Sequence, residues 1–427
     1  MIRRVLVAAL FMGATLVSSA VCFAQSAANL PDSPAYKGDI RRSPDGKLIA
    51  VEPPPVAQPQ AKESAAPVTL VVGPEERYRT ITEAAKAARD GDIVEIRPGE
   101  YRGQTAVWTQ NNLVIRGSGQ RPVLIADGKS AEGKALWVLR GGNVRIENIE
   151  FRGVRVKDGN GAGIRFERGH LTVHRCAFID NEMGILTNNT QDLTLTVSDS
   201  EFADAARHNV DVHHLLYVGA IGKFVLTGSR FTNGYRGHLV KSRARENDIR
   251  YNLLVDGVGG RASYELELPN GGLAYVIGNI FQKSETADNS VLVSYGSEGP
   301  RWQDNALYLA HNTLINDRHA GAFLKLSTER FSTAVESWVI NNLTVGSGDL
   351  FPPAHGRFEG NLSAPRRDLV DYAGIAARLK PDSSLRGKVR APGSANGVDL
   401  LPTAEFMPPA GQRRIHAGSQ LAPGALQ

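Results

Sequence analysis

Three stretches, LTVHRCAF (171–178), LTVSDSEF (195–202) and FVLTGSRF (224–231), repeat one pattern, and this pattern decides the fold. Each begins with alternating apolar and polar residues, turns at a small or polar residue, and carries an apolar residue two places later. The pattern recurs on both sides of them, in VRIENIEF (144–151), IRYNLL (249–254), YVIGNIF (275–281), LYLAHNTL (307–314) and WVINNLT (338–344). Successive units start their turns 23 to 33 residues apart.

A drifting period of this length, with an apolar spacing of two, is typical of the coils of a parallel β-helix. Each coil buries its inward side chains only by stacking on its neighbours. Helical repeats are excluded because their apolar residues recur about every 3.6 residues. A β-propeller is excluded because each blade needs four antiparallel strands, more than one unit supplies. The sequence therefore predicts an all-β solenoid, a parallel β-helix.

The turn residues of the units form one column. In the later units this position is always asparagine, at Asn252, Asn279, Asn312 and Asn342. The earlier units place other residues there, namely Ile149, Cys176, Ser200 and Ser229. Because asparagine tolerates left-handed turns and can hydrogen-bond to its stacked copy, we interpret the column as a turn ladder. A set of ligands in a site is the alternative interpretation.

Both ends of the chain differ from the repeats. Residues 1–24, with Arg3 and Arg4 before an apolar run and small residues at its end, predict a secretory signal peptide. An uncleaved anchor helix and a lipoprotein cysteine at Cys22 are the alternatives. Residues 25–67 are rich in proline and alanine and predict a linker or loose arm. The β-helix domain is expected over 68–351, and an extended tail with little packed structure over 352–427.

Composition narrows the class of protein. With 42% hydrophobic residues among 427, the chain can fill a core, so general disorder is excluded. The net charge of +5 is too small to indicate nucleic acid as a partner. The one long apolar run is N-terminal, so no membrane insertion is expected after signal cleavage, and the protein is predicted to be periplasmic or secreted. Cys176 then remains as a buried thiol, and the fold is held without a disulfide.

The start of the domain carries a family resemblance. Thr80 with Glu83 three residues later predicts a short capped helix over 80–88, and Ile93 to Ile96 reads as the first strand before Pro98-Gly99. This opening, followed by the coils, resembles the secreted bacterial right-handed β-helix proteins of the pectate-lyase superfamily. The resemblance implies a right-handed parallel β-helix with a short N-terminal capping helix. It also implies a lyase, hydrolase, esterase or epimerase acting on acidic polysaccharides, or a protein that only binds them.

A narrower resemblance lies within the coils. Gly237-His238-Leu239-Val240-Lys241-Ser242, followed by Tyr251-Asn252 and Gly278-Asn279, is similar to the alginate lyase and chondroitinase B family. That family carries a catalytic lysine in a Lys-Ser pair, which implies a catalytic role for Lys241. Its catalytic arginine has no match, because residues 266–271 contain no basic residue and Arg261 lies several positions early. Its acidic calcium ligands have no match before Lys241.

A second strand in each coil is expected to build a sheet whose outward side chains can be read in order. The densest polar set falls on three adjacent coils and comprises His208, Asp211, His213, His214, Tyr217, His238, Lys241, Arg243, Arg245, Glu246, Tyr264, Glu265, Glu267 and Asn270. If Leu266 and Leu268 point inward, Glu265 and Glu267 both point outward. Counting back eleven residues from Asn252 and Asn279 places Lys241 beside Leu268 and His238 beside Glu265.

These residue types suit the β-elimination of a uronate polymer. That reaction needs a neutralised carboxylate, a base for the proton at C5 and an acid for the leaving oxygen. Lys241 is the candidate base and Arg243 the group that neutralises the carboxylate; neighbouring cations can make a lysine more acidic. The candidate acids are His214, His238, Tyr217 and Tyr264. The candidate substrate-binding residues are Arg165, Asn181, Asn270, Tyr295 and Glu298.

Other interpretations stay open at this point. Glu265 and Glu267 are candidate ligands of Ca²⁺, a possible cofactor, because carboxylate oxygens suit that ion. The same lysine, histidines and carboxylates also fit a solvated surface or structural ion pairs. The sequence predicts an exported, monomeric polysaccharide lyase with an acidic polysaccharide as its partner. The alternatives are a C5-epimerase, a non-catalytic carbohydrate-binding β-helix, and a glycoside hydrolase using Glu265 with Asp211 or Asp180.

Overall fold

The computed structural model describes residues 66–207, 213–372, 374–416, Gly418 and 420–427, and a hairpin of β1 (Ile40–Arg42) and β2 (Leu48–Ala50). The hairpin belongs to a unit separate from the one that begins at Ala66. The predicted signal peptide lies outside the described residues, and so does the predicted linker apart from this hairpin and its last two residues. Within the described ranges, no helix has the length and apolar character that crossing a bilayer requires.

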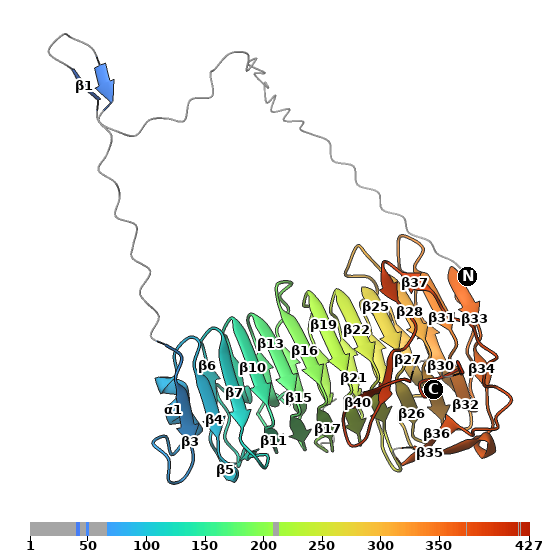
Figure 1. Ribbon diagram of the computed structural model, residues 1–427, viewed down its shortest axis with the longest axis horizontal. Helices are drawn as coiled ribbons and strands as arrows, with labels where there is room; N and C mark the ends of the chain where they lie inside the picture. Colours follow the sequence, from blue (N-terminus) through green and yellow to red (C-terminus); the bar gives the residue numbers. More distant parts are fainter. Residues whose placement is uncertain are drawn as a thin grey trace, which may run out of the picture. The chain divides into compact units, whose positions relative to one another are not determined.

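From Thr69 onward the chain winds through three parallel sheets, so the predicted all-β parallel β-helix is confirmed (Figure 1). The first sheet contains β3 (Thr69–Val72), β4 (Ile93–Ile96), β7 (Leu113–Gly117), β10 (Asn143–Glu147), β13 (His170–His174), β16 (Thr194–Ser198), β19 (Lys223–Thr227), β22 (Glu246–Arg250), β25 (Leu273–Ile277), β28 (Ala306–Ala310), β31 (Glu336–Ile340) and β33 (Gly356–Glu359). The second contains β5 (Glu100–Arg102), β8 (Val123–Ile125), β11 (Glu150–Arg152), β14 (Ala177–Ile179), β17 (Glu201–Ala203), β20 (Arg230–Thr232), β23 (Leu253–Val255), β26 (Ile280–Lys283), β29 (Thr313–Asn316), β32 (Leu343–Gly346) and β34 (Leu362–Ser363). The third contains β6 (Ala106–Trp108), β9 (Ala135–Leu139), β12 (Ala162–Phe166), β15 (Met183–Thr187), β18 (Leu216–Val218), β21 (Val240–Ser242), β24 (Leu266–Leu268), β27 (Val291–Tyr295) and β30 (Ala322–Leu326).

Equivalent positions of successive coils lie opposite each other. Leu171 pairs with Leu195, and Leu195 with Phe224, in the parallel ladder of β13, β16 and β19. The interior is therefore a stack of like residues. Its aromatic rings follow one another with centroids 4.6–5.3 Å apart, in the order Trp108, Trp137, Phe151, Phe178, Phe202 and Phe231. Burying a large apolar side chain contributes about 1.5–3 kcal/mol, so this stack is a main source of the solenoid's stability.

The predicted turn ladder is confirmed. The side-chain oxygen of Asn279 accepts the backbone N–H of Asn252 at 3.0 Å, and Asn312 accepts that of Asn279 at 2.9 Å. Asn342 continues the ladder, and Asn361 extends it by one coil that the sequence pattern did not include. The column satisfies backbone groups that the stacked turns bury away from water.

The ends of the solenoid are capped differently. The predicted capping helix is α1 (Ile81–Ala87), with a capping box in which Thr80 accepts the N–H of Glu83 at 3.1 Å. At the other end the coils continue past residue 351, through β33 and β34. The following chain forms a short 3₁₀ helix, η1 (Arg366–Asp368), and hairpins of β35 (Leu369–Tyr372) with β36 (Ile375–Leu379), β37 (Ser394–Ala395) with β38 (Val398–Asp399), and β39 (Ala404–Phe406) with β40 (Gln412–Arg414).

The C-terminal segment is more packed than the sequence predicts. Leu400, Phe406 and Leu426 are buried. Asn396 donates to the hydroxyl of Tyr308 at 3.1 Å on the first sheet, and Ala425 donates its N–H to Thr313 of the second sheet at 3.0 Å. The segment therefore covers the outer faces of the first and second sheets in the later coils, while the third sheet carries the polar set described next.

Candidate functional site

One outward row of the third sheet gathers the predicted site residues. Tyr217 on β18 lies opposite Lys241 on β21, and Lys241 opposite Glu267 on β24. The alternate residues Leu216, Val240 and Leu266 are fully buried in the core. Side chains alternate along a strand, so Lys241 lies on the outer wall of the solenoid, as its sequence position predicts.

The predicted register of this row is wrong by one residue. Lys241 lies beside Glu267 rather than Leu268, and His238 contacts Glu267 rather than Glu265. Eleven residues separate Lys241 from Asn252, but twelve separate Glu267 from Asn279. The additional residue is accommodated in the turn after β24, where Gly271 and Gly272 have φ angles of 72° and 91°. Such angles favour glycine, so this turn holds a conformation that other residues adopt only with strain.

Lys241 is surrounded by carboxylates. Its Nζ lies 3.0 Å from Oε2 of Glu267 and 3.2 Å from Oε1 of Glu298, and its side chain is 12% exposed. The same ammonium lies 5.8 Å from the centre of the Tyr217 ring. The sequence predicts Arg243 and Arg245 as cationic neighbours of Lys241. Arg243 contacts the same Glu298 carboxylate as Lys241, whereas Arg245 is exposed, and the groups that touch Nζ are two acidic side chains. Both carboxylates stabilise the charged ammonium.

Arg243 completes the cationic part of the wall. Its Nε donates to the hydroxyl of Tyr217 at 3.0 Å, and its Nη2 donates to Glu298 at 2.9 Å. Its Nη1 contacts both Asn270 and Glu298. Burial alone would lower the pKa of Arg243, but the contacts with Glu298 and Tyr217 outweigh it and raise the pKa. The guanidinium is therefore held in one orientation, with Lys241 and Arg243 meeting at Glu298.

Two histidines and a tyrosine form the adjoining strip of the wall. The rings of His214 and His238 are 4.6 Å apart, and those of His238 and Tyr264 are 4.9 Å apart. Nδ1 of His214 accepts the N–H of His238, and Nδ1 of His238 accepts the N–H of Tyr264. Burial lowers the pKa of both histidines, so both are neutral at neutral pH with the proton on Nε2. Nε2 of His238 lies 2.9 Å from Glu267.

Glu267 is the anionic centre of this wall. Burial would raise its pKa, but the contacts with His238 and Lys241 outweigh that effect and hold the pKa at about 2. Because the pKa in the folded protein lies below the ordinary value of 4.5, Glu267 stabilises the fold above about pH 4.5, and this contribution is lost as pH falls toward 2. Ser297 adds a hydrogen bond to Oε1 at 2.8 Å.

A Glu267→Gln variant should therefore lose less stability in acid than the natural protein. When pH falls from about 7 to about 3, the natural protein should lose about 2 kcal/mol of its free energy of unfolding because keeping Glu267 ionised becomes less favourable in acid. The amide of the variant does not titrate, so the variant should not show this part of the loss. Urea unfolding at both pH values measures the difference. Equal losses in the two proteins would show that Glu267 is not held ionised by its neighbours.

Glu265 lies elsewhere than predicted. Its side chain is fully buried, and Oε2 lies 3.0 Å from Nζ of Lys283, which is also fully buried. β24 begins at Leu266, so the alternation of side chains does not extend back to Glu265. Burial raises the pKa of Glu265 against the opposing effect of Lys283. With Glu265 on Lys283, and Glu267 on His238 and Lys241, these two carboxylates do not fit the predicted Ca²⁺ site. Among the described residues, no three His, Cys, Asp or Glu side chains are grouped so as to hold a metal ion.

Other predicted residues lie apart from the wall. Asn181 is buried and accepts the N–H of Val154, so it is a turn residue rather than a groove residue. Tyr295 is fully buried, with its hydroxyl on the carbonyl of Gly272, because it has the inward orientation of its strand. Arg165 shares the outward row with Lys241 but lies three strands away.

Of the carboxylates predicted for hydrolysis, the two that the structure describes, Asp180 and Glu265, contact other partners and do not form a pair. Asp180 contacts Arg155 at 2.5 Å on an exposed turn, and Glu265 is buried against Lys283. His208 and Asp211 lie outside the described residues. Sequence patterns do not predict two further contacts of the wall. Ser297 donates to Glu267, and the Trp302 indole donates to the Arg243 carbonyl at 3.1 Å.

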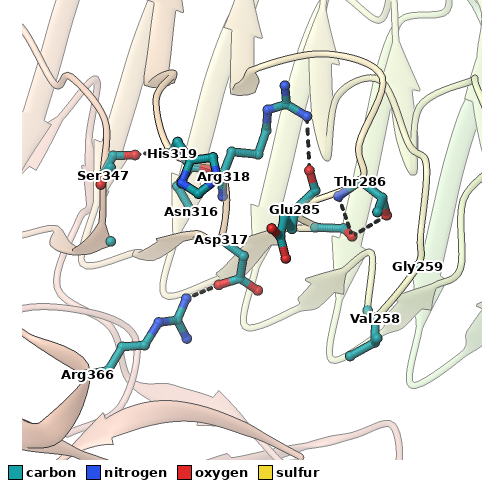
Figure 2. A pocket seen from close by; sticks show the side chains of 13 residues that line it. Val258, Gly259, Glu285, Thr286, Asn316, Asp317, Arg318, His319, Ser347 and Arg366 are labelled. Carbon is teal, nitrogen blue, oxygen red and sulfur yellow. Dashed lines mark hydrogen bonds and ion pairs between the residues drawn. The ribbon is translucent and has the colours of Figure 1, made fainter.

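A separate polar pocket of about 530 Å³ opens over turns that follow strands of the second sheet (Figure 2). Its lining includes Glu285, Asp317, Arg318 and Arg366. Asp317 is paired with Arg366, and Arg318 donates to backbone carbonyls, among them that of Glu285. The described residues that line this pocket include none of the predicted site residues, so we place the candidate site on the outer wall of the third sheet.

Comparison with known proteins bears on the fold. Pectate lyase Pel9A matches over 85% of this chain and 96% of its own, with a TM-score of 0.56 and 13% sequence identity. The chain adopts a pectate-lyase-like β-helix. The PL6-family alginate lyase AlyGC matches over 78% of this chain and 57% of its own, with a TM-score of 0.36 and 15% identity. No family model matches the chain. At such identities the likeness shows the fold alone, because one fold hosts many activities.

Proposed function

We propose that this pectate-lyase-like β-helix is an exported polysaccharide lyase that cleaves a uronic-acid-containing polymer by β-elimination. The observation that carries the proposal is the meeting of Lys241 and Arg243 on the outer wall, with Tyr217 beside both. Two cations held in fixed positions suit a polymer that carries carboxylates along its length, because charge that is placed in advance costs no reorganisation during the reaction.

Each residue has a step in this reaction. Arg243 pairs with the sugar carboxylate and makes the C5 proton more acidic. The Lys241 ammonium first releases a proton to water, and the free amine then takes the C5 proton; the electron pair forms the C4–C5 double bond, and the C4–O bond breaks. Tyr217 gives its proton to the leaving oxygen. A phenol is a stronger acid than the neutral imidazoles of His214 and His238, which favours Tyr217 for this step.

The electrostatics of the wall favour elimination over hydrolysis. A glycoside hydrolase needs one carboxyl group that keeps its proton as general acid. Contact with Arg243 lowers the pKa of Glu298, and the pKa of Glu267 is about 2, so both carboxylates on the wall are ionised at neutral pH. A C5-epimerase would use the same first step and return the proton to the opposite face.

Export and partner belong to the same proposal. The N-terminal Arg3 and Arg4, followed by the apolar run and small residues, support transport to the periplasm or the medium. The proposed partner is an acidic polysaccharide in that compartment, on which the protein acts as a monomer. The export step is tested by N-terminal sequencing of the protein from the periplasm, where a start near residue 25 is expected.

The test of activity is a glycan panel. The full mature chain is incubated with polygalacturonate, alginate and chondroitin, and with a carboxyl-reduced form of each polymer as the matched control. We expect at least one acidic polymer to yield products that absorb in the ultraviolet, while its carboxyl-reduced form yields none. Absence of unsaturated products from every acidic polymer, at pH values from neutral to alkaline, would contradict the proposal.

A further inference from the structure

The carboxylate of Glu298 lies where the two cations of the wall meet. Its Oε1 is 3.2 Å from Nζ of Lys241 and 2.9 Å from Nη2 of Arg243. Glu298 belongs to the turn after β27, and this turn reaches back over β24 to side chains of β21 and the residues after it. A carboxylate from the protein itself therefore fills the position where Lys241 and Arg243 converge.

Glu298 is held less tightly than the other carboxylate of the wall. Its side chain is 43% exposed, whereas that of Glu267 is 6% exposed. Glu267 is bound by His238 and Ser297 in addition to Lys241. Water reaches the Glu298 carboxylate and competes for its partners, so of the two carboxylates on the wall Glu298 is the one that can exchange with the carboxylate of a ligand.

The two cations do not depend on Glu298 for their positions. Without it, Lys241 keeps its contact with Glu267, and Arg243 keeps those with Tyr217 and Asn270. While Glu298 is in place, the positive charges of Lys241 and Arg243 are balanced by the negative charges of Glu267 and Glu298. When Glu298 leaves, one positive charge remains uncompensated at a preformed site, which matches one carboxylate of a ligand.

We propose that Glu298 occupies the carboxylate-binding site of the free protein, and that the carboxylate of a uronate sugar replaces it on Arg243, beside Lys241. This inference rests on the proposed function, because it names the group of the substrate that binds there. It changes the role of Glu298 from a residue that contacts the sugar to one that competes with it. Since the site is open only in the fraction of molecules in which Glu298 has moved away, the apparent affinity is reduced by that fraction.

The test compares the natural chain with Glu298→Gln, which keeps the shape of the side chain and removes its charge. Calorimetric titration with hexagalacturonate is expected to show at least ~5-fold tighter binding to the variant, because removal of the competitor opens the site. Neutral maltohexaose should show no such gain. Glu75→Gln, an exposed acid in the turn before α1, is the matched control for net charge and should bind like the natural protein.

A second measurement separates this inference from the proposed function. Acetate is titrated while the ¹⁵N resonance of Arg243 Nε is followed, and the variant should respond at lower acetate concentration than the natural protein. This result would support the carboxylate site even if no polymer is cleaved. Equal responses of both proteins to acetate, or weaker binding of hexagalacturonate by Glu298→Gln, would overturn the inference and leave the lyase proposal to the glycan panel.

Discussion

A Lys241→Ala variant is expected to form unsaturated product ~10²–10⁴-fold more slowly than the natural protein, because removal of a positioned base has effects of that size. The fold should remain, because Lys241 lies on the outer wall and its neighbours Val240 and Ser242 stay buried. The measurement is the initial rate of ultraviolet absorbance on the acidic polymer that the panel identifies. Thermal unfolding of the variant checks the fold.

A Lys241→Arg variant distinguishes a base from a binding cation. Arginine keeps the positive charge and the contact with Glu267 but does not lose its proton at the pH of the assay. If Lys241 is the base, the arginine variant should be nearly as inactive as the alanine variant. Lys223→Ala, which removes a lysine paired with Glu246 on the first sheet, is the control and should keep full activity. Activity of Lys241→Ala within a few-fold of the natural protein would remove Lys241 from the mechanism.

A Lys283→Met variant is expected to lower the free energy of unfolding by roughly 1–3 kcal/mol, the usual cost of leaving a buried polar group without its hydrogen-bond partner. Lys283 Nζ and Glu265 Oε2 are 3.0 Å apart and fully buried, and burial raises the pKa of Glu265 to about 8, so its carboxyl is mostly protonated at neutral pH. Lys283 also donates to the carbonyl of Ser263, which precedes Tyr264 in the strip of two histidines and a tyrosine on the outer wall. Equilibrium unfolding in urea at neutral pH measures the change.

A second substitution in the same protein tests the cause. In the double variant Lys283→Met with Glu265→Leu, neither polar group of the buried pair remains without a partner, so a large part of the lost stability should return. Lys325→Met, which changes an exposed lysine on β30, should leave stability within about 0.5 kcal/mol of the natural protein. If Lys283→Met is as stable as the natural protein, the pair does not stabilise the region behind the wall.

The stacking of the coils was predictable because it rests on short-range patterns. Alternation within strands placed Lys241 on the outer wall, and the asparagine column at Asn252 and Asn279 indicated the ladder that the structure contains. The burial of Tyr295 was predictable too, because it lies two residues after the buried Val293 on the same strand and so faces the same way. The prediction that Tyr295 binds substrate did not take this alternation into account. The alternation of apolar and polar residues therefore predicts which side chains point inward wherever a strand is unbroken.

The contacts between coils were less predictable, because they depend on turn lengths. One additional residue after β24 shifted the register, so the partner of Lys241 is Glu267 rather than Leu268. The burial of Glu265 depends on Lys283 in the next coil, which no local pattern connects to it. The reach of Glu298 back to Arg243 depends on the path of a turn. Such long-range pairings are decided by packing and charge after the coils have formed.

Elimination and hydrolysis are told apart by the mass of the products formed in water enriched in ¹⁸O. Elimination adds no water across the broken bond, so a lyase should give products whose masses sum to that of the parent oligosaccharide, with an unsaturated sugar at the new non-reducing end. These products should gain no ¹⁸O from bond cleavage. Hydrolysis would add one water for each bond cleaved and leave the heavy oxygen at the new reducing end. That result would contradict the assignment of Lys241 and Arg243 to a lyase.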